Sequence, residues 1–257
     1  AEKAVRSRLW SPNGPIRFGR LASGGAVAAA PWTPASEAST KIWLDGALGT
    51  TIVGGKVVAI ANQVAGGNNF VATNAGVEPD AVTGAFGRPA LGIIASASCG
   101  MLSATSGVYA VGDAFCCVSV MNLTAPLGRF RAVDSYDAFA TNLFAHHFEP
   151  AGAAYNFFEG FYNTGLSAVA GPVIIETYYS AGTMRGFVNG VAASVVNGMT
   201  PALAAMVNLY IGGSYAVAWE FNAMIWMAAN IHGTATQTSL RSYLGARFPG
   251  AGPVSYT

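Results

Sequence analysis

The sequence predicts an all-β fold: a two-sheet antiparallel sandwich with an extended N-terminal arm and a short C-terminal helix. Three observations predict it. From about residue 36 onward, short apolar runs alternate with turns rich in Gly, Asn, Ser and Pro. Asn189-Gly190 separates two such runs, which is a strong hairpin signal. Clear helical periodicity is confined to the stretch after residue 233.

Composition supports a folded core. Of the 257 residues, 52% are hydrophobic and 10% are charged. A disordered chain combines low hydrophobicity with high net charge, and an average globular domain is about a quarter charged. The chain must therefore bury a large core while its surface carries few charges.

Residues 1–35 form the predicted arm and residues 36–257 the sandwich. The arm is rich in Pro and Gly, and its first twenty residues carry one acidic residue, Glu2, against five basic ones: Lys3, Arg6, Arg8, Arg17 and Arg20. We expect these cations to dock on an acidic partner surface. An ordinary solvated terminus is the alternative. The body lacks a basic patch interleaved with aromatics, so no nucleic-acid partner is expected.

The first predicted strands cover residues 41–45, 51–53 and 56–61, and a long Asn/Gly-rich connection follows at 66–76. A three-strand meander is predicted at 173–179, 183–188 and 191–196.

Two further strands are predicted at 209–211 and 217–227. The second of these carries Glu220 and Asn222 within an apolar stretch, so we expect buried strands and no membrane span. The closing helix has its apolar side at Leu240, Tyr243, Leu244 and Phe248, with a threonine or serine before it as the cap. Residues 135–146 are a weaker helical candidate.

The cysteines and histidines predict no metal site. Cys99, Cys116 and Cys117 have no zinc spacing, and they are expected to be small buried hydrophobes or to include a bridge from Cys99 to Cys116 or Cys117. His146 and His147 with Glu149 would need further ligands, so a polar turn is expected there. No cofactor is predicted, and no motif supports a structural calcium ion.

Catalytic motifs are also absent. The sequence has no phosphate-binding loop, no nucleophile elbow and no zinc-protease motif. Glycosidases need two carboxyl groups on one face, but Glu220 is followed by Asn222 and Met224 at the alternate positions, and Glu176 by Tyr178 and Ser180. We therefore predict a non-enzymatic protein.

One aromatic cluster offers a candidate carbohydrate site. Sugar-binding faces combine aromatic rings with Asn, Asp or Glu side chains. The candidate residues are Tyr155, Asn156, Phe158, Tyr162 and Asn163. Packing of these rings in the core is the alternative.

Several segments in order resemble a known family: residues 41–45 (KIWLD), 88–91 (RPAL), 185–191 (RGFVNGV), 209–213 (LYIGG) and 220–225 (EFNAMI), followed by the closing helix. Over residues 36–250 the chain resembles laminin-G-like, concanavalin-A-like lectin jelly-roll domains of the kind found in bacteriophage structural proteins. The resemblance implies two antiparallel sheets packed face to face, and glycan or protein binding.

These observations predict a virion structural protein, such as a phage head-decoration, fibre or tail-associated protein, whose sandwich binds host-surface glycans. Other virion subunits are the expected partners, in a homo-oligomer, because so uncharged a surface tends to associate. A secreted bacterial carbohydrate-binding module is one alternative. A polysaccharide hydrolase using Glu159, Glu176 or Glu220 is another.

Overall fold

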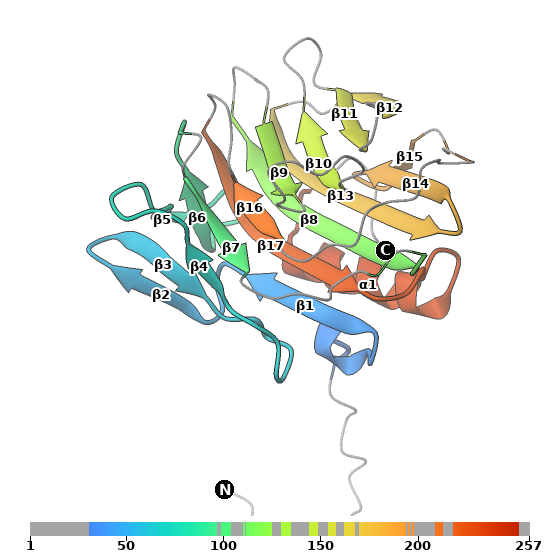
Figure 1. The fold of residues 1–257 in the computed structure, drawn as a ribbon, viewed down its shortest axis with the longest axis horizontal. Helices are drawn as coiled ribbons and strands as arrows, with labels where there is room; N and C mark the ends of the chain where they lie inside the picture. The colour runs from blue at the N-terminus through green and yellow to red at the C-terminus, as the bar shows by residue number, and fades with distance from the viewer. Residues whose placement is uncertain are drawn as a thin grey trace, which may run out of the picture. The chain divides into compact units, whose positions relative to one another are not determined.

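The computed structural model describes residues 31–96, 99–103, 110, 112–124, 130–134, 144–148, 154–157, 162–167, 170–193, 195, 197, 209–212 and 218–251. The chain divides into two units, Ala1–Pro31 and Trp32–Thr257. The arm cations Lys3, Arg6, Arg8, Arg17 and Arg20 lie outside the described residues, so their docking role stays a prediction. Within the second unit the predicted all-β sandwich with one C-terminal helix is confirmed (Figure 1).

One layer, the helix-side sheet, is centred on β8 (Phe115–Leu123) and β17 (Trp219–Met227), which pair along nearly their whole lengths. On its other edge β17 pairs first with β6 (Pro89–Ile93) and then with β1 (Thr40–Asp45). In spatial order this sheet contains β15 (Val191–Ala192), β14 (Thr183–Val188), β13 (Gly171–Ser180), β8 (Phe115–Leu123), β17 (Trp219–Met227), β1 (Thr40–Asp45) with β6 (Pro89–Ile93), and β5 (Asp80–Thr83).

The second layer, the opposite sheet, joins the first where β3 (Lys56–Ile60) meets β5, and the register pair described there is Lys56 with Asp80. All its described pairings are antiparallel. Its strands are β2 (Thr50–Val53), β3 (Lys56–Ile60), β4 (Phe70–Ala72), β7 (Gly100–Ser103), β16 (Tyr210–Gly212), β9 (Phe130–Asp134), β10 (Ala145–Phe148), β11 (Ala154–Phe157) and β12 (Tyr162–Ser167).

Two apolar cores lie on the two faces of the helix-side sheet. The inter-sheet core contains Phe115, Phe221 and Trp226 from this sheet and Phe70 and Ile211 from the opposite one. The second core lies under α1 (Ala235–Arg247), which covers the outer face of the helix-side sheet with side chains that include Leu240, Leu244 and Phe248 from α1 and its C-cap. Because β-strand side chains alternate between faces, β8, β13 and β17 can be apolar on both sides.

The local turn and cap signals are confirmed. Asn189 and Gly190 have φ angles of 49° and 78°, the left-handed conformation that a two-residue hairpin needs. The last strand of the meander is short, Val191–Ala192. The side chain of Thr234 caps α1 by accepting a hydrogen bond from the Gln237 N–H.

Two local expectations were wrong, and one alternative is excluded. The connection predicted at 66–76 contains β4, whose three residues are too few for a periodic pattern. Residues 145–148 form the strand β10, so the end of the helix predicted at 135–146 and the polar turn expected at His146 and His147 are both strand. His146 is buried in the core there. The three cysteines are free and buried, which confirms the prediction of small buried hydrophobes and excludes the alternative of a bridge from Cys99 to Cys116 or Cys117. Burial raises the pKa of the Cys117 thiol.

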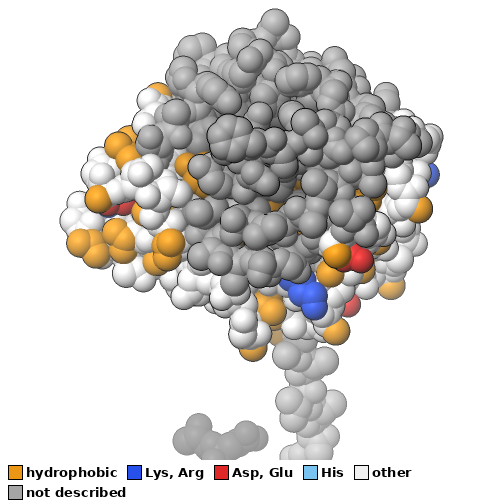
Figure 2. Space-filling model, in the orientation of Figure 1, with side chains coloured by type: hydrophobic (Ala, Val, Ile, Leu, Met, Phe, Trp, Pro, Cys, Tyr) orange, Lys and Arg blue, Asp and Glu red, His pale blue; other side chains and the backbone are white. Residues whose placement is uncertain are grey.

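β2 exposes apolar side chains. Ile52 and Val53 are 53% and 62% exposed, and Val71 on β4 is 46% exposed. Figure 2 shows apolar side chains gathered at the end of the molecule where β2 and β3 lie. Among the described strands β2 pairs with β3 alone. An edge strand with exposed apolar side chains is a ready template for contact with another chain.

Candidate functional site

On the outer face of the helix-side sheet, β1, β13 and β17 each carry an acidic side chain, and the three have different surroundings. Asp45 and Glu176 lie beneath α1, at 1% and 0% exposure. Glu220 lies beyond the end of the helix and is half-buried. Trp219 and Phe221 point into the inter-sheet core, so Glu220 between them faces outward.

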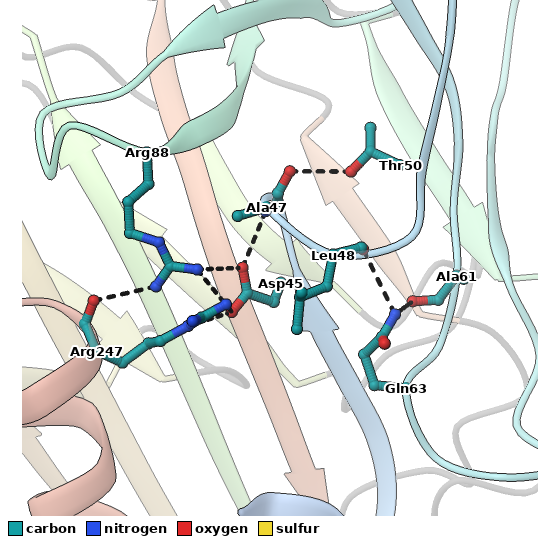
Figure 3. A network of polar contacts seen from close by, with 9 residues as sticks. Asp45, Ala47, Leu48, Thr50, Ala61, Gln63, Arg88 and Arg247 are labelled. Carbon is teal, nitrogen blue, oxygen red and sulfur yellow. Dashed lines mark hydrogen bonds and ion pairs between the residues drawn. The ribbon is translucent and has the colours of Figure 1, made fainter.

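Two arginines neutralise Asp45 (Figure 3). Arg247 of α1 donates through Nε to Asp45 Oδ2 at 2.8 Å, and Arg88 donates through Nη2 to Oδ1 at 3.3 Å. Arg88 also donates through Nη1 to the carbonyl oxygen of Arg247 at 3.1 Å. This network ties the end of α1 to β1 and to the β5–β6 loop, so Asp45 has a structural role.

Glu176 is held in a similar way beneath the middle of the helix. Arg241 of α1 donates through Nε to Glu176 Oε2 at 3.0 Å, and the Tyr178 hydroxyl donates to the same oxygen. Burial raises the pKa of Tyr178, because an ionised phenol would lose its hydration there. Glu176 is fully covered and ion-paired, which argues against the role of acid or base considered for it.

Glu220 is surrounded by neutral donors. Its Oε2 accepts hydrogen bonds from Ala85 N at 3.0 Å and from Asn122 Nδ2 at 3.2 Å. In the described part of the chain no arginine or lysine forms an ion pair with it. Its negative charge is therefore uncompensated by any cation of this region.

Asn222 completes the group, which we call the Glu220 cluster: Asn122, Glu220, Asn222, and Gly84 and Ala85 of the β5–β6 loop. Asn222 is the extra residue of a bulge in β17, since Phe221 pairs with Met121 and Ala223 with Val120. It is 2% exposed, and its Nδ2 has no hydrogen-bond partner among the described residues. A buried amide without a partner is costly.

Gly84 lets the β5–β6 loop lie against this cluster. A Cβ at this position would be 3.0 Å from Asn222 Oδ1 and 3.3 Å from Glu220 Oε2, and 2.8 Å from Ala90 Cβ. The two polar side chains therefore converge on one point beside the loop. A carboxylate and two amides gathered there can accept hydrogen bonds from hydroxyl groups and donate to them.

The sheet register extends this polar row. Asn122 pairs with Glu220, Glu220 with Gly92, and Gly92 with Asp80, so the four residues cross four adjacent strands on one face. Gly92 contributes no side chain. Asp80, two strands from Glu220, is bound by Lys56 Nζ at 2.5 Å on its far side.

The predicted carbohydrate residues lie elsewhere. Tyr155 and Asn156 belong to β11, and Tyr162 and Asn163 to β12, whose backbone register places Asn156 opposite Asn163. Phe158 lies outside the described residues. Their role in sugar binding stays a prediction.

Sequence reasoning missed the Glu220 cluster as a binding site. The sequence placed Glu220 and Asn222 on one predicted strand, where a second carboxylate for catalysis was missing. The remaining members come from β8 and from a loop 135 residues away, which only the register of the sheet brings together.

His146 occupies a separate buried position between the sheets. Its Nδ1 lies 2.7 Å from Ser119 Oγ and its Nε2 lies 2.9 Å from Thr177 Oγ1. Burial lowers the pKa of His146 to about 3, so the ring is neutral at ordinary pH. Among the described residues no group of three His, Cys, Asp or Glu could hold a metal ion, and no helix there is long and apolar enough to cross a bilayer.

Comparison with known proteins shows likeness in structure alone. No family model and no curated protein matches the sequence. Among solved structures, Trypanosoma rangeli sialidase is similar, with a TM-score of 0.55 and 12% identity over 85% of this chain and 34% of that one. The receptor-binding domain of botulinum neurotoxin D has a TM-score of 0.56 and 6% identity over 77% of this chain and 50% of that domain.

A third similar structure is domain 4 of an extracellular arabinanase from Geobacillus stearothermophilus in complex with arabinotriose. Its TM-score is 0.54, with 9% identity over 75% of this chain and 94% of that domain. The chain thus spans about a third of the sialidase and half of the toxin domain. At these identities the likeness concerns the fold, which is an antiparallel β-sandwich.

Proposed function

We propose that this protein is a carbohydrate-binding β-sandwich that binds glycan hydroxyl groups at the Glu220 cluster without cleaving them. The observation that carries the proposal is the half-buried Glu220 carboxylate, held by neutral donors beside the buried, unpartnered amide of Asn222. Adjacent hydroxyls of a sugar ring can donate to a carboxylate and accept from an amide at the same time. The arabinanase domain of the same fold holds arabinotriose.

Binding is favoured over hydrolysis by the carboxylate arrangement. Hydrolysis needs two carboxyl groups on either side of one bond. The next acidic residue along the polar row is Asp80, and Lys56 holds it on the side away from Glu220. Glu176, the other candidate acid, is buried under α1.

A glycan array with the purified protein, followed by titration of the best neutral oligosaccharide, tests this proposal. Glu220→Gln should weaken binding about tenfold or more, because a hydrogen bond to a charged acceptor contributes roughly 1.5–3 kcal/mol. Asn122→Ala should weaken it less. Glu78→Gln is the matched control, because Glu78 only accepts a hydrogen bond from Gly76 N in a loop.

Equal affinity of Glu220→Gln and Glu78→Gln would overturn this site. Release of shorter sugars from the bound oligosaccharide, lost in Glu220→Gln, would instead establish a hydrolase.

The proposed setting is a virion, with the arm of residues 1–35 docked on other subunits and the sandwich displayed outward. The arm carries five of the thirteen basic residues of the chain, and β2 offers an exposed apolar edge for a homo-oligomer. Deleting residues 1–30 should abolish incorporation into particles and leave glycan binding intact. Normal incorporation of the truncated protein would overturn the docking role and favour a secreted module.

A further inference from the structure

A second polar cluster lies on the same outer face, near the N-terminal end of α1. Arg185 and Phe187 come from β14, His232 from the β17–α1 connection and Arg241 from α1. All four are half-buried, so a ligand could contact them. We call them the Arg185 cluster.

The aromatic part of this cluster is a stack. The Arg241 guanidinium lies over the Phe187 ring, with Cζ 4.6 Å from its centroid. The His232 ring is stacked with Phe187 at 5.7 Å between centroids and 26° between planes. The ring of Tyr178 meets both with its edge, at 5.8 Å from Phe187 and 5.5 Å from His232. The packing fixes the positions of the rings.

The charges of the cluster do not balance. Glu176 compensates Arg241, as described above. Arg185 lies opposite Tyr178 in the sheet register, on the same face as Phe187, and within the described part of the chain it forms no hydrogen bond or ion pair. One guanidinium therefore remains available next to the aromatic stack.

The nearby start of the helix adds positive potential. The N-terminal end of a helix carries a partial positive charge. There the Gly233 N–H donates to Gln237 Oε1, while Gln237 Nε2 is buried and has no partner among the described residues. An uncompensated cation beside the start of a helix favours an anionic ligand.

We propose that the Arg185 cluster binds the carboxylate of an acidic sugar, with Arg185 as its ion-pair partner. The half-exposed rings of Phe187 and His232 provide apolar surface for the sugar ring beside it. This inference rests on the proposed glycan binding and gives it a preferred class, which is acidic glycans.

His232 gives the site a measurable pH response. Burial, followed by the charges of Arg185 and Arg241, lowers its pKa, while Glu176 acts in the opposite direction; Tyr178 also faces it. A bound carboxylate stabilises the protonated ring. Affinity for an acidic sugar should therefore rise as the pH falls from 7 to 5.

The test uses two oligosaccharides of equal length, one ending in glucuronate and one in glucose, measured by calorimetry at pH 7 and pH 5. The full chain should bind the glucuronate form about tenfold more tightly, the size expected for one charge-assisted contact. Arg185→Gln should remove this preference and leave the melting temperature unchanged. Lys41→Gln is the matched control, because Lys41 is exposed on β1.

Three results would overturn the inference: equal affinity for both sugars, an unchanged preference in Arg185→Gln, or acetate competing as well as the glucuronate sugar. His232→Asn should flatten the pH response, and an unaltered response would remove His232 from the site. If the glucose-ended sugar binds through Glu220 while the preference is absent, only this inference fails. If neither sugar binds, the proposed function fails with it.

Discussion

Asp45 and Glu220 are acidic side chains on the same face of one sheet, and their surroundings differ. Asp45 is buried and receives two guanidinium groups, one from the helix that covers it. Glu220 lies past the end of that helix and receives only an amide and a backbone N–H. A carboxylate paired with cations ties structural elements together, whereas one held by neutral donors keeps its charge available for a ligand.

Asp45→Asn should destabilise the protein more than any other substitution proposed for this sheet. It leaves Arg88 and Arg247 side by side without their anion, and breaking a buried pair costs about 3–5 kcal/mol. Since both arginines are partly exposed, we expect a loss of about 2–3 kcal/mol in the free energy of unfolding.

Urea denaturation of Asp45→Asn and Glu220→Gln would compare the two carboxylates directly. Glu220→Gln should lose less than about 1 kcal/mol, since the amide keeps an oxygen acceptor. Equal losses in both variants would break the distinction between a structural and a ligand-binding carboxylate.

His146 makes a pH-dependent contribution to stability. Its pKa is lowered from 6.5 to about 3 in the folded protein. Between these values the unfolded chain binds a proton that the folded one excludes, so stability is lost as the pH falls. The loss is about 1.4 kcal/mol per pH unit, or about 2 kcal/mol from pH 6.5 to pH 5.

Denaturation of the wild type and of His146→Gln at pH 7 and pH 5 isolates this contribution. The variant should be less stable at pH 7 and should lose less between the two values. An identical loss in both proteins would show that other groups carry the pH dependence.

Gly84→Ala should have a smaller effect on stability than Asp45→Asn or the acidification of His146, and a larger one on sugar binding. The added methyl group would crowd Ala90, Asn222 and Glu220, and overpacking of this kind costs about 1–3 kcal/mol. We expect a value near 1 kcal/mol, because the loop can shift. Titration with the neutral oligosaccharide should show weaker binding, and unchanged affinity would argue that the ligand does not approach Glu220 from the loop side.

Local sequence signals predicted the turns and the helix well. Asn189-Gly190 and the Thr234 cap act over a few residues, so they are readable without the fold. β4 was missed because Phe70–Ala72 is short and lies among Asn and Gly residues. The apolar side of α1 could be predicted from its periodicity. The ion pairs of the helix could not, because Arg241 binds Glu176, 65 residues away, and Arg247 binds Asp45, 202 residues away.

The candidate sites are harder to predict because they depend on register. Asn122 reaches Glu220 only because β8 and β17 pair as they do, and a shift by one residue would turn one of them into the core. Arg185 and His232 are brought together by the hairpin of β13 and β14 and by the course of the chain into α1. No short motif encodes either arrangement.

The anchoring of α1 also constrains the order of folding. The helix follows in the chain all the strands that it covers, and both carboxylates that receive its arginines precede it. During synthesis the sheet can therefore pair before the helix emerges, with Val118, Ile174 and Ile225 still facing water. In that interval the nascent chain presents an apolar surface edged by two unneutralised acids, a state in which a chaperone or a neighbouring chain could bind before α1 covers it.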